Sequence, residues 1–193
     1  MHIRHSRRYV VFMDKPILHG PRIQLRPLLA SDVDAFLAGL EDPESTRLTG
    51  TQQTFTREQI QHWCATRLEQ EDRIDYVILR SESATLMGEV VLNEIDFVNR
   101  NANLRIALWS GFTDQGFGSE AIRLVLEHAF LLLNLNRVGL EVYAFNPRAQ
   151  HVYQKLGFKT EGVLREVLLQ DGVFADAIIM GMLRSEFLRD RDG

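Results

Sequence analysis

The stretch that determines the fold reads Thr113-Asp114-Gln115-Gly116-Phe117-Gly118-Ser119-Glu120-Ala121. Glycines at positions 116 and 118 let the backbone come close to a ligand and reach conformations that other residues avoid. Successive N–H groups of such a turn can point at one anion, and a helix that follows adds the positive end of its dipole. The stretch therefore predicts a phosphate-binding turn and makes a nucleotide-like cofactor the leading hypothesis.

A long amphipathic helix is expected directly after this turn. Its apolar residues recur every three or four positions, as one buried face requires, while Arg123 and Glu127 lie on the opposite face. The residues of the apolar face are Ile122, Val125, Leu126, Ala129, Phe130 and Leu133.

Two familiar nucleotide-binding patterns do not fit the turn. Gly116, Gly118 and Ala121 match the alanine-ending dinucleotide fingerprint, but that fold needs an acidic residue about twenty positions later, at the end of the next strand. Glu141 lies instead inside the strand-like run 137–143. The phosphate loop of nucleotide hydrolases is excluded because no Gly-Lys-Ser or Gly-Lys-Thr follows.

A second motif spans residues 146–158, Asn-Pro-Arg-Ala-Gln-His-Val-Tyr-Gln-Lys-Leu-Gly-Phe. It has the features of one complete short helix. Asn146 is a good N-cap, Pro147 suits the first turn, and Gly157 can take the left-handed closing position. The order is thus glycine turn, helix, strand and capped helix.

This order resembles the GNAT superfamily of acyl-CoA-dependent N-acetyltransferases. Its members carry a Gln/Arg-x-x-Gly-x-Gly/Ala loop followed by Asn-x-x-Ala/Ser-x-x-x-Tyr-x-Lys-x-Gly-Phe. The resemblance runs from about Arg22 to Leu183. Residues 161–166, 171–172 and 176–180 are similar to the branch that contains ribosomal-protein N-terminal acetyltransferases and spermidine acetyltransferases.

Two positions depart from the family pattern. Thr113 stands where the loop usually begins with Gln or Arg, which removes a side chain but no backbone donor. Asn103 stands in the preceding strand where the branch often has Glu, which removes a candidate acid.

The composition is that of one compact domain. The chain has 193 residues, of which 45% are hydrophobic and 25% charged, enough to bury a substantial core. A net charge of −4 argues against a general nucleic-acid binder, for which a basic excess is expected. Cys64 is the single cysteine, so an internal disulfide is excluded and no metal-ligand spacing is present.

We divide the chain into an N-terminal arm (1–21), an acetyltransferase domain (22–185) and a C-terminal tail (186–193). The arm has Arg4, Arg7 and Arg8, but its apolar run 9–13 is shorter than a signal-peptide core. We interpret the arm as a strand, a dimer contact or a disordered segment. No run reaches membrane-spanning length, and a cytoplasmic location is the default expectation.

The remaining pattern predicts a strand around Ile23 and Leu25, a helix that Ser31-Asp32 caps and Asp42-Pro43 ends, and a second helix over 56–71. Strands are expected near 76–79, 86–97 and 102–109, and then near 160–169 and 173–183 on either side of the hairpin turn 170–172. The predicted fold is a mixed α/β (α+β) sandwich with a central, largely antiparallel sheet flanked by helices.

The resemblance also implies a cofactor site, with acetyl-CoA as the acyl donor. The strand Ile106-Ala107-Leu108 is expected to pair with the pantetheine arm, and a main-chain N–H there to polarise the thioester carbonyl. Thr113, Asp114, Gln115, Gly116, Phe117, Gly118 and Ser119 take the pyrophosphate, and Asn146, Ala149 and Lys155 complete the cofactor contacts. Tyr153 is the expected proton donor to the sulfur, since a phenol of pKa about 10 is protonated at neutral pH. Its place on the apolar helix face also fits a core tyrosine.

The residues leave the general base open. The candidates are Glu94, Asp96, Glu161, Glu166 and His151, and water can also carry the proton to solvent. The acceptor pocket is expected to use the loop from Glu41 to Thr56 and the second helix, with Phe55 and Trp63 as lining candidates.

Two functions from different classes are compatible with these motifs. The first is an N-acetyltransferase that moves an acetyl group directly to a primary amine of a peptide or ribosomal-protein N-terminus, a polyamine or another small amine. The second is a catalytically degenerate acyl-CoA-binding module. Thr113, Asn103 and the unassigned base favour the module, whereas the intact motifs favour the enzyme. A homodimer is expected only by analogy with the other members of this branch.

Overall fold

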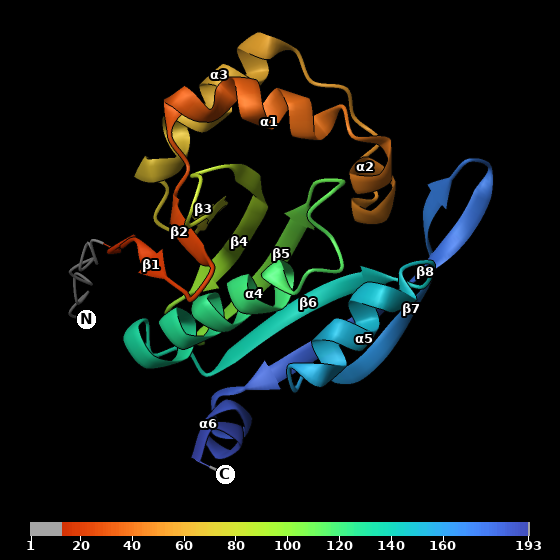
Figure 1. Ribbon diagram of the computed structural model, residues 1–193. Coiled ribbons are helices and arrows are strands. Elements are labelled where there is room, and N and C mark those ends of the chain that lie inside the picture. Colours follow the sequence, from red (N-terminus) through yellow and green to blue (C-terminus); the bar gives the residue numbers. More distant parts are fainter. Residues whose placement is uncertain (1–12, 193) are drawn as a thin grey trace, which may run out of the picture.

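The protein is described by a computed structural model in which residues 13–192 are placed. They form an eight-stranded sheet with the strand order β1-β2-β3-β4-β5-β6-β8-β7 (Figure 1). Neighbouring strands are antiparallel except β5 and β6, which are parallel. The strands are β1 (Leu18–His19), β2 (Ile23–Pro27), β3 (Ile74–Arg80), β4 (Leu86–Asp96), β5 (Asn101–Leu108), β6 (Arg137–Tyr143), β7 (Lys159–Gln170) and β8 (Val173–Leu183). The predicted mixed, largely antiparallel sheet is confirmed.

Helices cover both faces of the sheet, as Figure 1 shows. The α-helices are α1 (Val33–Leu40), α2 (Pro43–Thr49), α3 (Arg57–Thr66), α4 (Phe117–Glu127), α5 (Pro147–Lys155) and α6 (Arg184–Asp192). On one face α1 and α3 pack against Val77 and Leu79 of β3. On the other face α4 and α5 pack against a larger core that includes Leu104 of β5 and Val138 of β6.

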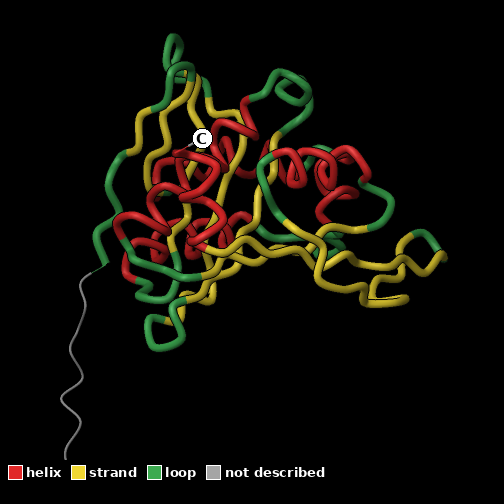
Figure 2. The backbone as a smooth tube through the Cα atoms, turned by 90° about the horizontal axis from the view of Figure 1, so that it is seen from below, coloured by secondary structure: helices red, strands yellow, loops and turns green. Residues whose placement is uncertain are grey.

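The position of the site depends on the one parallel strand pair. β5 and β6 are paired only over Asn101↔Arg137, Ala102↔Val138 and Asn103↔Gly139, after which the two strands separate. α4 connects them on one face, as a parallel pair requires a crossover. The sheet therefore opens between β5 and β6, and in Figure 2 the outer β7–β8 hairpin projects away from the helices.

The motif helices form where the pattern predicts them. Ile122, Val125 and Phe130 are buried, and Arg123 and Glu127 are exposed. The predicted helix is not uniform, however, because α4 passes at His128 into a π-helical turn, His128–Leu132. The predicted hairpin turn is confirmed, with Asp171 and Gly172 both at positive φ.

Three local predictions on the α1–α3 side differ from the structure. Asp32 does not cap α1 with its side chain, because its carboxylate pairs with Arg26 at 2.7 Å and accepts from the Leu29 N–H. Asp42 and Pro43 end α1, but the polar stretch after them is helix α2, since the Asp42 carboxylate accepts from the N–H groups of Glu44 and Ser45. The second predicted helix is shorter than expected. Its regular part, α3, is followed by a 3₁₀ turn, Arg67–Glu69.

The ends of the chain are only partly described. The predicted arm falls mostly on residues 1–12, which lie outside the described residues. Residues 186–192, predicted as a tail, belong to α6, whose Phe187 packs against the main core. No helix within residues 13–192 is long and apolar enough to cross a membrane. No group of His, Cys, Asp and Glu in the described chain could hold a metal ion.

Candidate active site

A large cavity of about 230 Å³ opens where β5 and β6 separate. Its walls come from α2, β5, the turn before α4, the first turns of α4, β6 and α5. The lining residues are Ser45, Leu48, Thr49, Leu104, Arg105, Ile106, Ala107, Leu108, Thr113, Asp114, Gly116, Gly118, Ser119, Ile122, Glu141, Val142, Tyr143, Asn146, Arg148, Ala149, Val152 and Tyr153.

The edge of β5 provides backbone groups for an extended ligand. Beyond the pair Asn103↔Gly139, β5 has no strand beside it on the β6 side within the described chain, and Ile106, Ala107 and Leu108 line the cavity. Unpaired N–H and C=O groups on a strand edge can bind a ligand chain as an added strand would. This edge therefore suits an amide-containing arm such as pantetheine.

The glycine turn closes one end of the large cavity. Gly116 has φ of 81° and Asp114 has φ of 59°, both in the left-handed region. No described side chain caps α4, so the first N–H groups of the helix have no side-chain partner there. Arg22 holds the turn in place, because its Nη1 donates to the Gln115 carbonyl at 2.9 Å and its Nε pairs with Glu120 at 3.0 Å. The result is a turn that Arg22 ties to β2 and that has donors available to an anion.

Three predicted cofactor residues do not line the large cavity. The Gln115 side chain turns back and donates to the Gly111 carbonyl at 2.7 Å. Phe117 is 5% exposed and packs into the core beneath the guanidinium of Arg22. Lys155 is exposed near the end of α5. The other cofactor residues predicted from the sequence are brought together around the cavity.

α5 brings Tyr153 into the large cavity. Asn146 caps the helix, because its side-chain oxygen accepts from the Ala149 N–H at 3.1 Å. Tyr153, two turns further along, is 8% exposed and packs edge-on against Phe158. Burial raises the pKa of the Tyr153 phenol to about 12, which keeps the proton on the oxygen at neutral pH.

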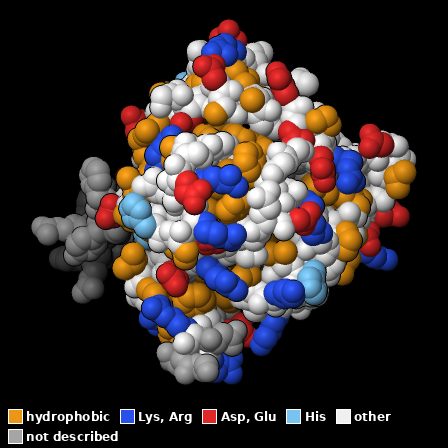
Figure 3. Space-filling view, viewed as in Figure 1, with side chains coloured by type: hydrophobic (Ala, Val, Ile, Leu, Met, Phe, Trp, Pro, Cys, Tyr) orange, Lys and Arg blue, Asp and Glu red, His pale blue; other side chains and the backbone are white. Residues whose placement is uncertain are grey.

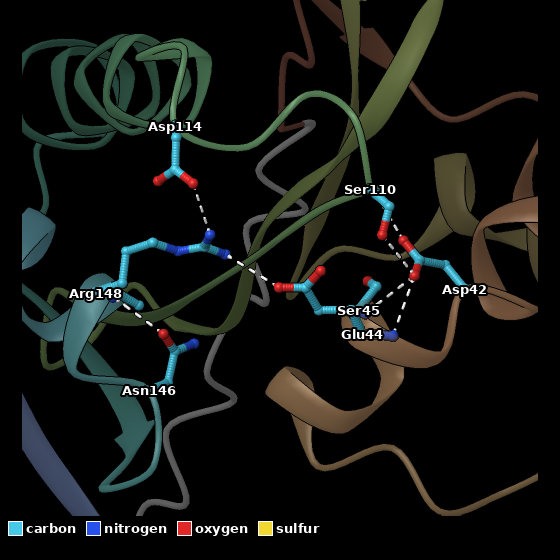
Figure 4. Close-up of polar contacts among 8 residues, drawn as sticks. Asp42, Glu44, Ser45, Ser110, Asp114, Asn146 and Arg148 are labelled. Carbon is cyan, nitrogen blue, oxygen red and sulfur yellow. Dashed lines mark hydrogen bonds and ion pairs between the residues drawn. The ribbon is translucent and has the colours of Figure 1, made fainter.

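Charged side chains link the two sides of the cavity mouth, as Figure 4 shows. Arg148 of α5 pairs with Asp114 of the turn at 2.9 Å and approaches Glu44 of α2 at 4.0 Å. Asp42 accepts from the Ser110 hydroxyl at 2.8 Å, which ties α2 to the end of β5. Because these groups are largely exposed, we assign them a positioning role rather than a large contribution to stability.

A small cavity of about 50 Å³ adjoins the large one on the α1–α3 side of the sheet. The two cavities share Ser45, Thr49, Arg105 and Ala107. The remaining lining residues are Phe36, Gly39, Leu40, Thr46, Thr51, Glu89 and Trp109. A group bound here would reach the reacting end of a ligand on β5 from the opposite face of the sheet.

Glu89 is the acidic group of the small cavity. Its Oε2 is buried and has no hydrogen-bond partner among the described residues. Burial raises the pKa of the Glu89 carboxyl to about 7, with a further rise from the charge of Asp75 and opposing effects of Arg105, Arg73 and Arg67. A carboxyl with this pKa can both accept and release a proton near neutral pH.

The general-base candidates chosen from the sequence lie elsewhere. Glu94 and His151 are exposed, and Asp96 accepts hydrogen bonds from Val98 and Asn99 in the β4–β5 turn. Glu161 pairs with Arg137, and Glu166 is exposed on β7. None of the five lines either cavity.

The acceptor side also differs from the expectation. Phe55 is 39% exposed, and Trp63 packs edge-on against Phe36 at 5.0 Å. Neither residue lines a cavity, and α3 contributes no residue to either one. From the predicted loop 41–56, helix α2 and Thr51 line the small cavity. Helix α1 supplies apolar lining residues of the same cavity.

Most of the chain matches a known protein family. Residues 22–159 match the family described as the acetyltransferase (GNAT) domain. The chain belongs to the GNAT acetyltransferase family. It is 30% identical over 174 residues to the uncharacterized N-acetyltransferase YoaA of Bacillus subtilis, covering 88% of this chain and 97% of that protein. It is 32% identical over 111 residues to a spermidine N(1)-acetyltransferase of Vibrio cholerae, covering 58% of this chain and 64% of that enzyme.

Solved structures agree with the family assignment at the level of the fold. The spermidine N-acetyltransferase of Vibrio cholerae, in a crystal structure with CoA and spermine, superposes with a TM-score of 0.82 at 24% identity, covering 88% of this chain and 99% of that one. The GNAT fold predicted from the motifs is therefore confirmed.

Membership of the GNAT family decides between the two functions considered above. The chain is an N-acetyltransferase that uses acetyl-CoA as its acyl donor and an amine as acceptor. The alternative of a degenerate acyl-CoA-binding module is not favoured. Figure 3 shows basic side chains together with acidic ones on the face that carries α4.

Several cavity residues of this GNAT enzyme were missed in the sequence. Arg148 lies within the motif 146–158, and the capped helix α2 was detectable from Asp42-Pro43, which begins helices as readily as it ends them. Glu89 and Arg105 had no local signal. They stand in strands whose neighbours are known only once the sheet is assembled.

Proposed function

We propose that the enzyme transfers the acetyl group directly from acetyl-CoA to a primary amine, with the donor in the large cavity and the acceptor in the small one. The observation that carries the proposal is that the two cavities share Ser45, Thr49, Arg105 and Ala107 as lining residues. The pantetheine arm would lie along Ile106, Ala107 and Leu108. The pyrophosphate would lie on the N–H groups of residues 113–119, where Gln115 and Phe117 contribute only their backbone.

The reaction begins with attack of a neutral amine nitrogen on the thioester carbonyl carbon. Negative charge then develops on the carbonyl oxygen, and a main-chain N–H of β5 is suitably placed to stabilise it. Collapse of the tetrahedral intermediate breaks the carbon–sulfur bond, and the departing thiolate takes a proton from the Tyr153 hydroxyl. Tyr153 suits this role because it lines the large cavity and stays protonated at neutral pH.

The ammonium group must lose one proton before it attacks, and we assign the removal of this proton to Glu89. The second proton, which the nitrogen loses as the intermediate collapses, replaces by way of solvent the one that Tyr153 gives to the thiolate. Its carboxyl lies in the small cavity, where an incoming ammonium group would be bound. Glu89 pairs with Ala107 across the β4–β5 ladder, so it stands beside the strand that would hold the thioester. A raised pKa near 7 makes it a better base than an ordinary carboxylate.

The phenol of Tyr153 provides the first test. Tyr153→Phe should lower kcat by about 100-fold or more and leave the Kd for acetyl-CoA nearly unchanged, because only the proton donor is lost. The measurements are amine-dependent CoA release and calorimetric titration with acetyl-CoA. Tyr76→Phe is a matched control, since the Tyr76 hydroxyl is buried in the core without a partner among the described residues and lines neither cavity. Unchanged turnover in Tyr153→Phe would contradict the acid role.

Several statements made from the sequence remain predictions. The domain boundaries at 22 and 185, the cofactor contact of Lys155 and the cytoplasmic location are not tested by the structure. A homodimer gains support from the β7–β8 hairpin, where Val163, Val167, Val173 and Phe174 are each about half exposed or more. Exposed apolar side chains on a projecting hairpin are compatible with a protein contact there. The acceptor classes predicted from the sequence were a polyamine, a peptide or ribosomal-protein N-terminus, or another small amine.

A further inference from the structure

Two opposite charges face the same side of adjacent strands at the small cavity. In the β4–β5 ladder Glu89 pairs with Ala107 and Arg105 pairs with Val91. Glu89 and Arg105 are therefore diagonal neighbours on one face, with Cα atoms about 7–8 Å apart. Both residues line the small cavity, and Arg105 also lines the large one.

Neither charge has a protein partner in the described part of the chain. Arg105 makes no hydrogen bond or ion pair there, and the buried Oε2 of Glu89 has no hydrogen-bond partner. The two side chains do not pair with each other either. The same face shows what a satisfied pair looks like, because Asp75 of β3 binds Arg73 through two hydrogen bonds of 2.6 and 2.8 Å. The buried Glu89 oxygen is costly to leave unpaired, whereas the exposed Arg105 guanidinium is hydrated and can turn toward a ligand in the cavity.

The rest of the small cavity limits the size of that ligand. The volume of about 50 Å³ has room for an ammonium group with a short stretch of its carbon chain. Phe36 and Trp109, which pack edge-on at 6.4 Å, form its apolar wall. The Thr46 and Thr49 hydroxyls donate to the backbone carbonyls of Asp42 and Ser45, which leaves their oxygen lone pairs available to accept from an ammonium group. The remainder of an acceptor must extend past Arg105 toward the large cavity.

We propose that the acceptor is a zwitterion, a primary amine that also carries a carboxylate, with its ammonium group at Glu89 and its carboxylate at Arg105. An amino acid or another amino-carboxylic acid has this chemistry. The inference rests on the proposed function, because it places the acceptor in the small cavity. A polyamine would bring a second cation toward the guanidinium of Arg105 and be repelled.

The test compares acceptors that differ only in the carboxylate. Amine-dependent CoA release is measured for phenylalanine against phenylalaninamide and phenethylamine, for lysine against cadaverine, and for spermidine. The wild-type enzyme should favour the acids in kcat/KM by about tenfold or more, as expected for a charge-assisted hydrogen bond. Arg105→Gln should remove most of this preference, and Arg105→Lys should retain part of it.

Arg123→Gln is the control, because Arg123 lies on the exposed face of α4 and lines neither cavity. Its preference for the acids should equal that of the wild type. Equal use of acids, amides and amines by the wild type would overturn the inference. So would a preference for spermidine that Arg105→Gln leaves unchanged, or no turnover of any acid in the panel.

Calorimetric titration with acetyl-CoA separates this inference from the proposed function. Binding of acetyl-CoA, together with turnover of amines that lack a carboxylate at least as efficient as turnover of the acids, contradicts the zwitterion alone. Absence of acetyl-CoA binding contradicts both.

Discussion

Gly116 is the residue on which the cofactor turn depends. Its φ of 81° lies in the left-handed region, and a Cβ there would stand 3.1 Å from Nη2 of Arg22. A β-branched side chain is strained in this conformation and would also project at the lining of the large cavity. The same position serves as N-cap of α4, so its backbone sets the direction of the first helical N–H groups.

Gly116→Val should therefore weaken acetyl-CoA binding by about tenfold or more, since left-handed strain costs about 1–2 kcal/mol before any crowding of the pyrophosphate. Isothermal titration calorimetry measures the change in Kd. Gly172→Val is the control, because Gly172 has a similar φ of 78° in the distant β7–β8 turn, where a Cβ would meet no described atom within 4 Å. Equal affinity in Gly116→Val and wild type would refute the pyrophosphate placement.

The pKa of Glu89 predicts how kcat/KM depends on pH. Its raised pKa near 7 means that the carboxyl is protonated, and unable to accept a proton, in most molecules below that pH. The groups that set this pKa are Asp75, Arg105, Arg73 and Arg67, after burial itself. The kcat/KM of the wild type should thus rise with pH through about 7 and level off above it.

Glu89→Gln should abolish this rise of kcat/KM near pH 7, the acid limb of the pH–rate profile, and lower kcat/KM by about 100-fold at pH 8. A pH–rate profile of both proteins, with acetyl-CoA saturating, makes the comparison. If the variant kept the limb near pH 7, another group would be the base, and unchanged rates would favour proton release through water.

At the scale of elements, α1 must approach the end of β5 very closely. Gly39 makes the approach possible, because a Cβ at this position would stand 2.0 Å from Nε1 of Trp109. Trp109 in turn forms a wall of the small cavity and packs edge-on against Phe36 of α1. The contact between helix and strand end therefore shapes the acceptor side.

Gly39→Ala should displace the Trp109 indole and raise the KM for the acceptor while the Kd for acetyl-CoA stays nearly constant. Helix propensity favours alanine by about 1 kcal/mol, but overpacking costs about 1–3 kcal/mol, so a net loss of stability is expected. Steady-state kinetics with a varied acceptor, together with thermal unfolding, test this. Ala38→Ser, on the exposed side of α1, is the control and should change neither the KM for the acceptor nor the Kd for acetyl-CoA.

At the scale of the whole molecule, the charge on Glu89 is a cost to folding. A carboxyl whose pKa is raised from 4.5 to about 7 binds more protons in the folded state than in the unfolded state between these values. Since stability then falls as pH rises, the penalty grows from about pH 4.5 upward and is complete above pH 7. Its size is on the order of 3 kcal/mol.

Glu89→Gln should accordingly unfold at a higher temperature than the wild type at pH 8, and the difference should shrink toward pH 4.5. Calorimetric unfolding across this pH range measures it. Glu82→Gln, at an exposed position between β3 and β4, should follow the wild type throughout. A variant less stable than the wild type at pH 8 would indicate that the carboxylate is held by favourable interactions.

Much of the fold was predictable from local patterns. The glycine turn, the cap at Asn146, the hairpin at Asp171 and the alternating strands each depend on residues close together in the chain. α2 was missed because a short polar segment becomes helical through its Asp42 cap and its tie to Ser110 at the end of β5. The π-helical turn at His128 had no signal in the apolar spacing.

The proposed cofactor half of the site lies in two continuous motifs, so the sequence was sufficient to predict the donor and to select the glycine turn and Tyr153, which the fold brings together around one cavity. The acceptor half was decided by tertiary structure alone. Glu89, Arg105 and Gly39 belong to β4, β5 and α1, which are far apart in sequence and meet only when the ladder register and helix packing are established. Local propensity and spacing carry no information about such contacts, because burial and unpaired charge are properties of the assembled fold.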